Sequence, residues 1–107
     1  MNLTRIEQLL KFLEEDPNDV FSLYALTLEY KKSNPAEAVK LFRQLLTNHP
    51  DYLPTYYQAG MMMEESGNTD EALELYQKGI VLARKLNDAA TLKELQAAYN
   101  LLLDEDE

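Results

Sequence analysis

The chain has 107 residues, of which 46% are hydrophobic, and its formal net charge at pH 7 is -9. This length suits one domain with a core, and the negative charge argues against binding of nucleic acids or anionic membranes, which both require a positive face. The absence of cysteine excludes disulfides, thiolate nucleophiles and the common structural zinc sites. The sequence shows no signal-peptide pattern and no apolar run of about 18 residues, so we expect a cytoplasmic protein.

Residues 3–15 form the first predicted helix, because their apolar residues recur at helical spacing. The apolar face consists of Ile6, Leu9, Leu10 and Leu13. Thr4 and Glu7 have the spacing of a capping box at the start of this helix, which ends at residues 16–18. A second helix is predicted from about residue 19 to residue 32.

The third predicted helix begins with Asn34 as its cap and Pro35 in its first turn. It ends at residues 48–50. The fourth begins near Pro54, which again suits a first turn, and ends at residues 66–68.

The fifth predicted helix is capped by Asn68 or Thr69 and extends to about Leu86. The sixth spans residues 88–103. The tail at residues 104–107 is entirely acidic, and because a helix dipole disfavours negative charge at its carboxyl end, we expect this tail to be disordered.

The chain contains an internal repeat. The sequence DPNDVFSLYALTLEYKKSN at residues 16–34 aligns with HPDYLPTYYQAGMMMEESG at residues 49–67, with an offset of 33 residues. After the turn, AEAVKLFRQLL at residues 36–46 aligns with DEALELYQKGI at residues 70–80, with an offset of 34. Each unit is therefore two helices and a tight turn, and the first turn is one residue shorter than the second.

The second unit has large, small and aromatic residues at the positions Tyr56, Ala59, Gly60, Met63, Gly67, Ala72 and Tyr76. In this pattern the chain resembles the tetratricopeptide repeat family. The first unit departs from the pattern, with Thr27 at the usual small residue and Asn34 at the turn glycine. The resemblance implies an all-α fold, in which antiparallel helix hairpins form a right-handed solenoid of about six helices.

The resemblance also divides the chain. It implies a single domain over residues 1–103, made up of a leading helix (1–16), repeat 1 (18–50), repeat 2 (51–86) and a C-terminal capping helix (88–103). The residues that it assigns to packing within the repeats are Leu23, Leu26, Thr27, Tyr30, Ala38, Phe42, Tyr56, Ala59, Gly60, Met63, Ala72 and Tyr76. A glycine inside a helix costs about 1 kcal/mol relative to alanine, so we expect Gly60 and Ala72 to permit a close helix crossing.

In this family the first helix of each hairpin lines a concave groove that receives a peptide. Carried over by position, the resemblance assigns to this groove Phe21, Tyr24, Leu28, Lys31, Tyr57, Gln58, Met61, Glu64 and Lys93. One subclass grips a C-terminal carboxylate with Lys and Asn side chains, but Tyr24, Leu28 and Gln58 occupy those positions here. We therefore do not expect that mode of recognition. The aromatic and thioether side chains suit an apolar or amphipathic ligand instead.

The three consecutive methionines do not form a metal site, because successive helical residues point about 100° apart. We expect Met61 to face the groove, Met62 to lean toward the preceding repeat and Met63 to lie in the core. Nucleophilic catalysis is not expected either, since the single histidine, His49, precedes a proline in a predicted exposed turn. The sequence thus indicates no enzyme, no cofactor and no metal.

Two functions remain. The first is a non-catalytic interaction module or adaptor that binds a protein, as a peptide or helix, in its concave groove. The alternative is a self-associating structural scaffold, a homodimer held together by exposed apolar faces of the terminal helices. Phe12 lies off the main apolar face of the first helix, and Leu101-Leu102-Leu103 ends the last one, which supports the alternative.

Overall fold

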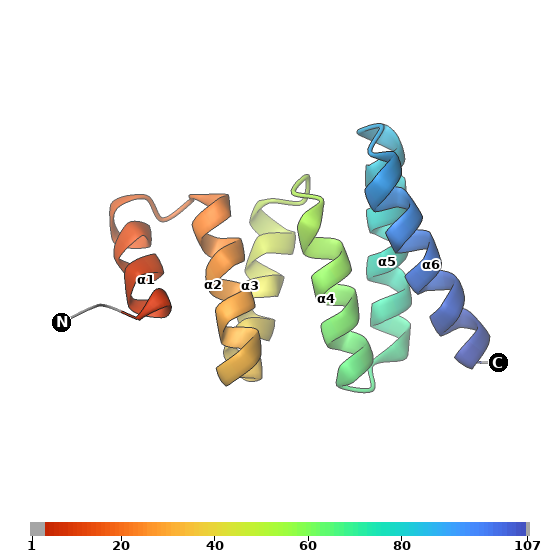
Figure 1. Ribbon diagram of the computed structural model, residues 1–107, viewed down its shortest axis with the longest axis horizontal. Coiled ribbons are helices and arrows are strands. Elements are labelled where there is room, and N and C mark those ends of the chain that lie inside the picture. Colours follow the sequence, from red (N-terminus) through yellow and green to blue (C-terminus); the bar gives the residue numbers. More distant parts are fainter. Residues whose placement is uncertain (1–3, 107) are drawn as a thin grey trace. The chain divides into compact units, whose positions relative to one another are not determined.

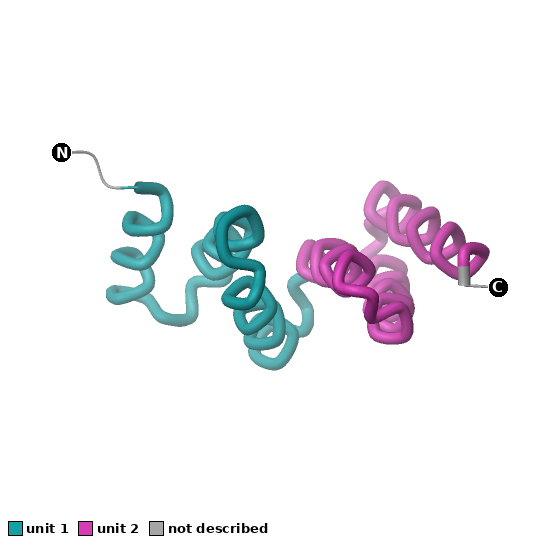
Figure 2. The backbone as a smooth tube through the Cα atoms, turned by 90° about the horizontal axis from the view of Figure 1, so that it is seen from below, with its two compact units in different colours: residues 1–52 teal, residues 53–107 magenta. Residues whose placement is uncertain are grey.

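The computed structural model describes residues 4–106, and within this range the chain consists of α-helices joined by short turns, without strands. The helices are α1 (Arg5–Glu15), α2 (Val20–Ser33), α3 (Pro35–Asn48), α4 (Pro54–Glu65), α5 (Thr69–Lys85) and α6 (Ala89–Asp106) (Figure 1). The predicted all-α fold of helix hairpins is confirmed. The chain divides into two compact units, unit 1 at residues 1–52 and unit 2 at residues 53–107 (Figure 2).

In unit 1, α1 packs against α2, and α2 and α3 form an antiparallel hairpin. The capping box that the sequence predicts defines the start of α1. The backbone N–H of Glu7 donates to Thr4 Oγ1 over 3.1 Å, and the Glu7 carboxylate accepts a hydrogen bond from the Thr4 backbone N–H over 3.4 Å. Residues 1–3, which the predicted leading helix included, lie outside the described residues.

A single residue, Asn34, separates α2 from α3. Its backbone N–H donates to the carbonyl oxygen of Tyr30 over 2.6 Å, and its side chain accepts a hydrogen bond from the backbone N–H of Glu37 over 3.4 Å. Asn34 therefore ends one helix and begins the next, with an ordinary negative φ of -148°. This turn needs no left-handed residue, which explains why unit 1 has no glycine there.

In unit 2, α4 and α5 form a second hairpin, and α6 packs against α5. The turn after α4 contains Gly67 with a left-handed φ of 81°, and the N–H of Asn68 donates to the carbonyl oxygen five residues earlier over 2.8 Å. Asn87, with φ 57°, and Asp88, whose N–H makes the equivalent bond over 3.0 Å, repeat this arrangement after α5. Both turns are Schellman motifs, which satisfy the last carbonyl groups of a helix.

The residues predicted to pack within the repeats form about half of the buried hydrophobic core. All of them are buried except Tyr30, which is half-buried. Thr27, which takes the place of the usual small residue in unit 1, is fully buried, and its hydroxyl donates to the Leu23 carbonyl oxygen over 2.7 Å. A polar group is thus accommodated in the core because its hydrogen bond is made locally.

Gly60 lies against the ring of Tyr76 on α5, a neighbour that the repeat pattern had not identified. A Cβ atom added to Gly60 would lie 2.3 Å from Tyr76 Cε1. Ala72 is fully buried, but the aromatic ring is the neighbour that requires the glycine. The sequence did not predict that a glycine is also required at position 79. A Cβ atom added to Gly79 would lie 2.8 Å from Tyr56 Cβ and 3.0 Å from Leu95 Cδ1.

The predicted end of the last helix at Leu103 is too early. Helix α6 continues to Asp106, so Asp104 and Glu105 are helical, not part of a disordered tail. Leu102 is only 7% exposed and anchors the final turn, and this burial outweighs the small dipole penalty of exposed acidic residues. Glu107 lies outside the described residues.

Candidate interaction surface

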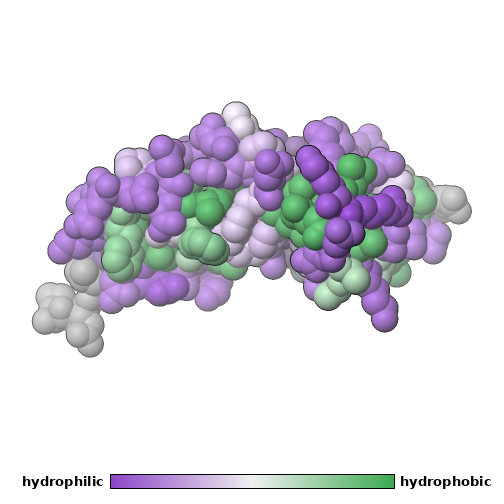
Figure 3. All heavy atoms as spheres, turned by 90° about the horizontal axis from the view of Figure 1, so that it is seen from above, coloured by the Kyte–Doolittle hydropathy of each residue, from purple (hydrophilic) through white to green (hydrophobic). Residues whose placement is uncertain are grey.

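We call α2 and α4 first helices and α3 and α5 second helices, according to their order in each hairpin. On α2, the residues predicted to face a ligand are spaced three or four positions apart and so share one side of the helix: Phe21, Tyr24, Leu28 and Lys31. Phe21 is 70% exposed, and the other three are half-buried. Figure 3 shows apolar side chains between hydrophilic ones on the face of each unit that is in view.

Tyr52, which the sequence analysis did not select, holds two of these aromatic side chains in place. Its ring centroid lies 5.9 Å from that of Phe21, edge to face at 90°, and 5.4 Å from that of Tyr24 at 66°. Edge-to-face arrangements are favoured because the positive edge of one ring meets the negative face of another. Burial raises the pKa of Tyr52 above its usual value. Unit 1 thus presents an aromatic cluster with Phe21 as its most exposed member.

Tyr52 was missed because it lies between the helices, where helical periodicity gives no information about side-chain direction. Its sequence neighbours Asp51 and Leu53 carry no pattern that links it to α2. The one available signal was the aromatic residue itself, since a large aromatic residue in a short connection usually packs on an adjacent element.

In unit 2, the predicted ligand-facing residues of α4 are all half-buried: Tyr57, Gln58, Met61 and Glu64. Lys93, the predicted contribution of α6, is exposed. Met62 and Met63 are each only 5% exposed, so Met61 is the methionine of the run that reaches the surface. The different exposure of three successive residues follows from their angular separation around the helix.

Tyr76 supports this side of α4 from the core. Its ring is fully buried and lies 6.3 Å from the Tyr57 ring, tilted by 49°. Its hydroxyl donates a hydrogen bond to the Glu64 carboxylate. Burial, together with this hydrogen bond and the negative charge of Glu64, raises the pKa of Tyr76 well above its usual value. One buried tyrosine therefore positions both an aromatic ring and a carboxylate at the surface.

The described part of the chain shows no group of three or more His, Asp or Glu side chains that could hold a metal ion. Within the same residues, no helix combines the length and the apolar character needed to cross a membrane. His49 does lie in the turn after α3, but the prediction that it is exposed is wrong. It is half-buried, and its Nε2 atom is inaccessible to solvent, because the turn packs that edge of the ring inward.

Comparison with known proteins agrees with the repeated helix hairpins described above. A family model described as tetratricopeptide repeat matches residues 19–52 and 55–78. The solution structure of a tetratricopeptide repeat domain protein from Salinibacter ruber is 40% identical in sequence, with a TM-score of 0.77, and the match covers 81% of this chain and 89% of that one. The curated protein sequences gave no match.

Two further structures are similar in fold. A protein from Bordetella parapertussis gives a TM-score of 0.83 at 22% identity, over 98% of this chain and 92% of that one. A crystal structure of the MamA protein gives a TM-score of 0.67 at 21% identity, over 92% of this chain and 57% of that one.

Proposed function

The chain belongs to the tetratricopeptide repeat family, whose members are typically non-catalytic protein–protein interaction modules, and we propose that it binds a peptide or helix through the exposed sides of α2 and α4. The residues that we assign to this contact are the predicted ligand-facing residues of these two helices, together with Tyr52. The exposed side of α2 belongs to unit 1 and that of α4 to unit 2, and each is a contact surface of its own.

The observation that carries this proposal is that surface aromatic side chains are already held in place. Phe21 is 70% exposed, yet its ring is supported by the edge-to-face contact with Tyr52. The Tyr57 ring is supported by the tilted ring of buried Tyr76. Binding requires that side chains lose rotational freedom, at a cost of about 0.5–1.5 kcal/mol for each mobile side chain. Rings that are fixed beforehand avoid part of this cost, which favours their use as anchors.

The chemistry of these residues favours an amphipathic partner. The aromatic rings and Met61 offer apolar contact area, and Met adapts its shape to irregular ligands. Glu64, which is held by the Tyr76 hydroxyl, offers a fixed carboxylate to a basic group of the ligand. The formal net charge of -9 further supports a protein ligand over nucleic acid or an anionic membrane.

The double variant Tyr57→Ala with Met61→Ala tests this proposal. We expect it to lose the partners that the wild-type protein captures from a lysate, as identified by mass spectrometry, because both ligand-facing apolar side chains of α4 are removed. Phe21→Ala provides a second variant, whose side chain is so exposed that the fold is retained. Leu86→Ala is the matched control, since Leu86 is 51% exposed but lies at the end of α5.

Circular dichroism melting curves decide how a loss of capture is interpreted. Loss of the same partners in both variants, with melting curves close to wild type, supports the proposal. Full capture by folded variants contradicts it. If the double variant unfolds, Tyr57 and Met61 are core residues, and the Phe21→Ala result alone decides whether the face of α2 binds a partner.

A further inference from the structure

Helix α1 has the sequence pattern of a second helix, and the described residues before it contain no first helix. The sequence FLEEDPN at residues 12–18 aligns with LLTNHPD at residues 45–51, which ends the second helix α3. On this alignment Phe12 corresponds to Leu45. Leu45 is 0% exposed, whereas Phe12 is 59% exposed. This position of the repeat is therefore buried in α3, which belongs to a complete hairpin, and exposed to solvent in α1.

The complete hairpin of unit 2 shows what normally covers this position. Gly79 of α5 is the next equivalent residue, 34 positions after Leu45. It lies between Tyr56 of its own first helix and Leu95 of α6, since a Cβ atom added to it would lie 2.8 Å and 3.0 Å from these two side chains. A residue at this position thus contacts a first helix on either side.

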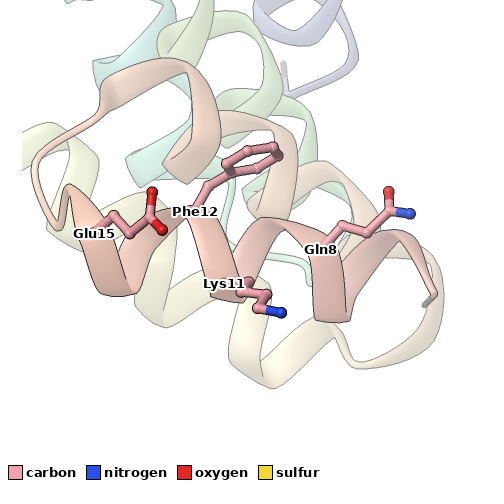
Figure 4. Close-up of a pocket in the computed structure, with 4 residues that line it drawn as sticks. All are labelled: Gln8, Lys11, Phe12 and Glu15. Carbon is pink, nitrogen blue, oxygen red and sulfur yellow. The ribbon is translucent and has the colours of Figure 1, made fainter.

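In unit 1, α1 has α2 on one side only (Figure 1). Phe12 and its neighbours at helical spacing, Gln8, Lys11 and Glu15, line a shallow hollow along α1. Figure 4 shows the Phe12 ring projecting from the helix beside these polar side chains. Within the described residues of this unit, no first helix covers the hollow.

Helix α6 has the complementary pattern, that of a first helix, and no second helix follows it within the described residues. Leu92, Leu95 and Tyr99 match Tyr56, Ala59 and Met63 of α4, with an offset of 36. The same offset places Gln96 over Gly60 and Asn100 over Glu64. Gly60 and Glu64 are residues of α4 that contact Tyr76 on its second helix.

In unit 2, Gln96 and Asn100 instead line an open hollow together with Val81 of α5. Val81 is 62% exposed, in the C-terminal part of α5. Helix α6 therefore presents the side on which a first helix packs against its second, and the described part of unit 2 supplies no helix there.

We infer that α1 of one copy of this protein binds the hollow beside α5 and α6 of another copy and completes a repeat hairpin between the two chains. In the hairpin register of α4 and α5, Gly79 lies against Tyr56. The equivalent residues in the contact between copies are Phe12 and Leu92. Two apolar side chains are thus paired.

Charge complementarity supports a second copy as the occupant. In a hairpin, the carboxyl end of the first helix lies beside the amino end of the second. Here that places Asp104 and Glu105 of α6 beside exposed Arg5 and the amino terminus of α1, which carries a positive partial charge. Acidic residues that are unfavourable at the end of their own helix become favourable next to the start of another.

The contact joins the α1 surface of one copy to the α5 and α6 surface of another. Every pair of chains therefore keeps one free α1 surface and one free α5 and α6 surface. Such a heterologous contact adds further copies and does not stop at two unless a rotation closes a ring. This distinguishes the inference from a symmetric homodimer, in which the same surface of both chains is used.

Sedimentation velocity over a series of concentrations tests the inference. We expect the weight-average mass of the wild-type protein to rise beyond twice the chain mass of 12.3 kDa as the concentration increases. Phe12→Asp, which blocks the α1 surface, and Val81→Asp, which blocks the α5 and α6 surface, each remain monomeric. An equimolar mixture of the two variants forms a heterodimer, because one intact surface of each kind remains.

Phe21→Asp is the matched control, since it places the same charge on an aromatic position of α2 that is more exposed than Phe12, and it leaves the mass series unchanged. Circular dichroism confirms that each variant is folded. A wild-type protein that is monomeric at every concentration overturns the inference and leaves the hollow of α1 to another occupant. A mass that saturates at a dimer, with no heterodimer in the mixture, identifies a symmetric contact and also overturns it.

Discussion

In the hairpin of α4 and α5, the ring of Tyr76 lies on the backbone of Gly60, where any side chain would occupy the same space. Inside a helix, glycine costs about 1 kcal/mol relative to alanine. The close approach of the ring offsets this cost because it buries a whole tyrosine side chain and lets its hydroxyl reach Glu64. The glycine is thus required by its neighbour and not by its own backbone conformation.

The substitution Gly60→Ala tests this explanation. The added Cβ atom would lie 2.3 Å from Tyr76 Cε1, so the buried ring must move. Overpacking of this kind costs about 1–3 kcal/mol, and the better helix propensity of alanine returns about 1 kcal/mol. We expect the free energy of unfolding, measured by urea denaturation, to fall by up to about 2 kcal/mol.

A second background provides the control. In a Tyr76→Leu chain the ring is absent, so Gly60→Ala should be neutral or stabilising there, and a double-mutant cycle gives the coupling between the two positions. An equal loss in both backgrounds would show that Tyr76 is not the reason for the glycine.

At the scale of helices, three of the described turns each contain one residue that ends one helix and begins the next. Asn34 ends α2 and caps α3, and Asn68 closes the turn after α4 and caps α5. Asp88 does the same between α5 and α6, where it accepts hydrogen bonds from the Thr91 backbone N–H over 3.0 Å and from the Thr91 hydroxyl over 2.9 Å.

Asp88 makes the start of α6 sensitive to pH. The hydrogen bonds from the Thr91 backbone and hydroxyl lower the pKa of Asp88 in the folded chain. Its stabilising contribution is therefore present above the unfolded pKa of about 3.9 and is lost as the pH falls through the lower folded pKa. Asp88→Asn keeps an acceptor but cannot titrate. We expect this variant to melt at a lower temperature than wild type at neutral pH and the difference to shrink below about pH 4.

Thermal melting by circular dichroism at several pH values measures this difference. Thr91→Val serves as a control, because it removes the hydroxyl donor while it leaves the backbone donor in place. A difference between wild type and Asp88→Asn that stays constant down to strongly acidic pH would rule out the cap as its cause.

The helices could be predicted from the sequence because their signals are local. Thr4 with Glu7, Asn34 with Pro35, and Asn68 each mark a helix start within a few residues, and the structure has all three as caps. The contacts of Gly60, Gly79 and Tyr52 could not be predicted, because each depends on a side chain from another helix or turn. The end of α6 was misjudged because the acidic residues were visible in the sequence and the burial of Leu102 was not.

The candidate surface was predictable only in part, for the same reason. The spacing of Phe21, Tyr24 and Leu28 places them on one side of α2, and periodicity alone is sufficient for that. Packing between elements brings Tyr52 against two of the rings and Tyr76 against Tyr57 and Glu64, and local spacing does not predict these contacts. Which protein binds there depends on contacts that only a complex contains.

At the scale of the whole molecule, the helices differ in how much of their surface is buried. In α1 the one fully buried residue is Leu9, whereas α3 buries Ala38, Phe42 and Leu45. Repeat proteins gain their stability from each unit and from contacts between neighbours, so a helix with fewer neighbours opens more readily.

We therefore expect amide hydrogen exchange in α1 to be faster than in α3 or α5 in dilute solution. Mass spectrometry of proteolytic fragments after deuterium labelling measures this, with urea-unfolded protein as the reference for full exchange. Equal protection of α1 and α3 in the monomer would contradict the expectation. Protection of α1 that increases with protein concentration would follow from its contact with a second copy.

The link between Tyr76 and Glu64 has a practical consequence for the whole chain. The sequence contains seven tyrosines and no tryptophan, so its near-ultraviolet spectrum arises from tyrosine, with only a weak background from phenylalanine. The Tyr76 ring is fixed in the core, while the acceptor of its hydroxyl proton lies at the surface. A cationic group that binds Glu64 alters this hydrogen bond and with it the absorption of a rigid, buried chromophore. We therefore expect a basic ligand of Glu64 to change the near-ultraviolet difference spectrum through Tyr76, and a Tyr76→Phe chain to lose that change.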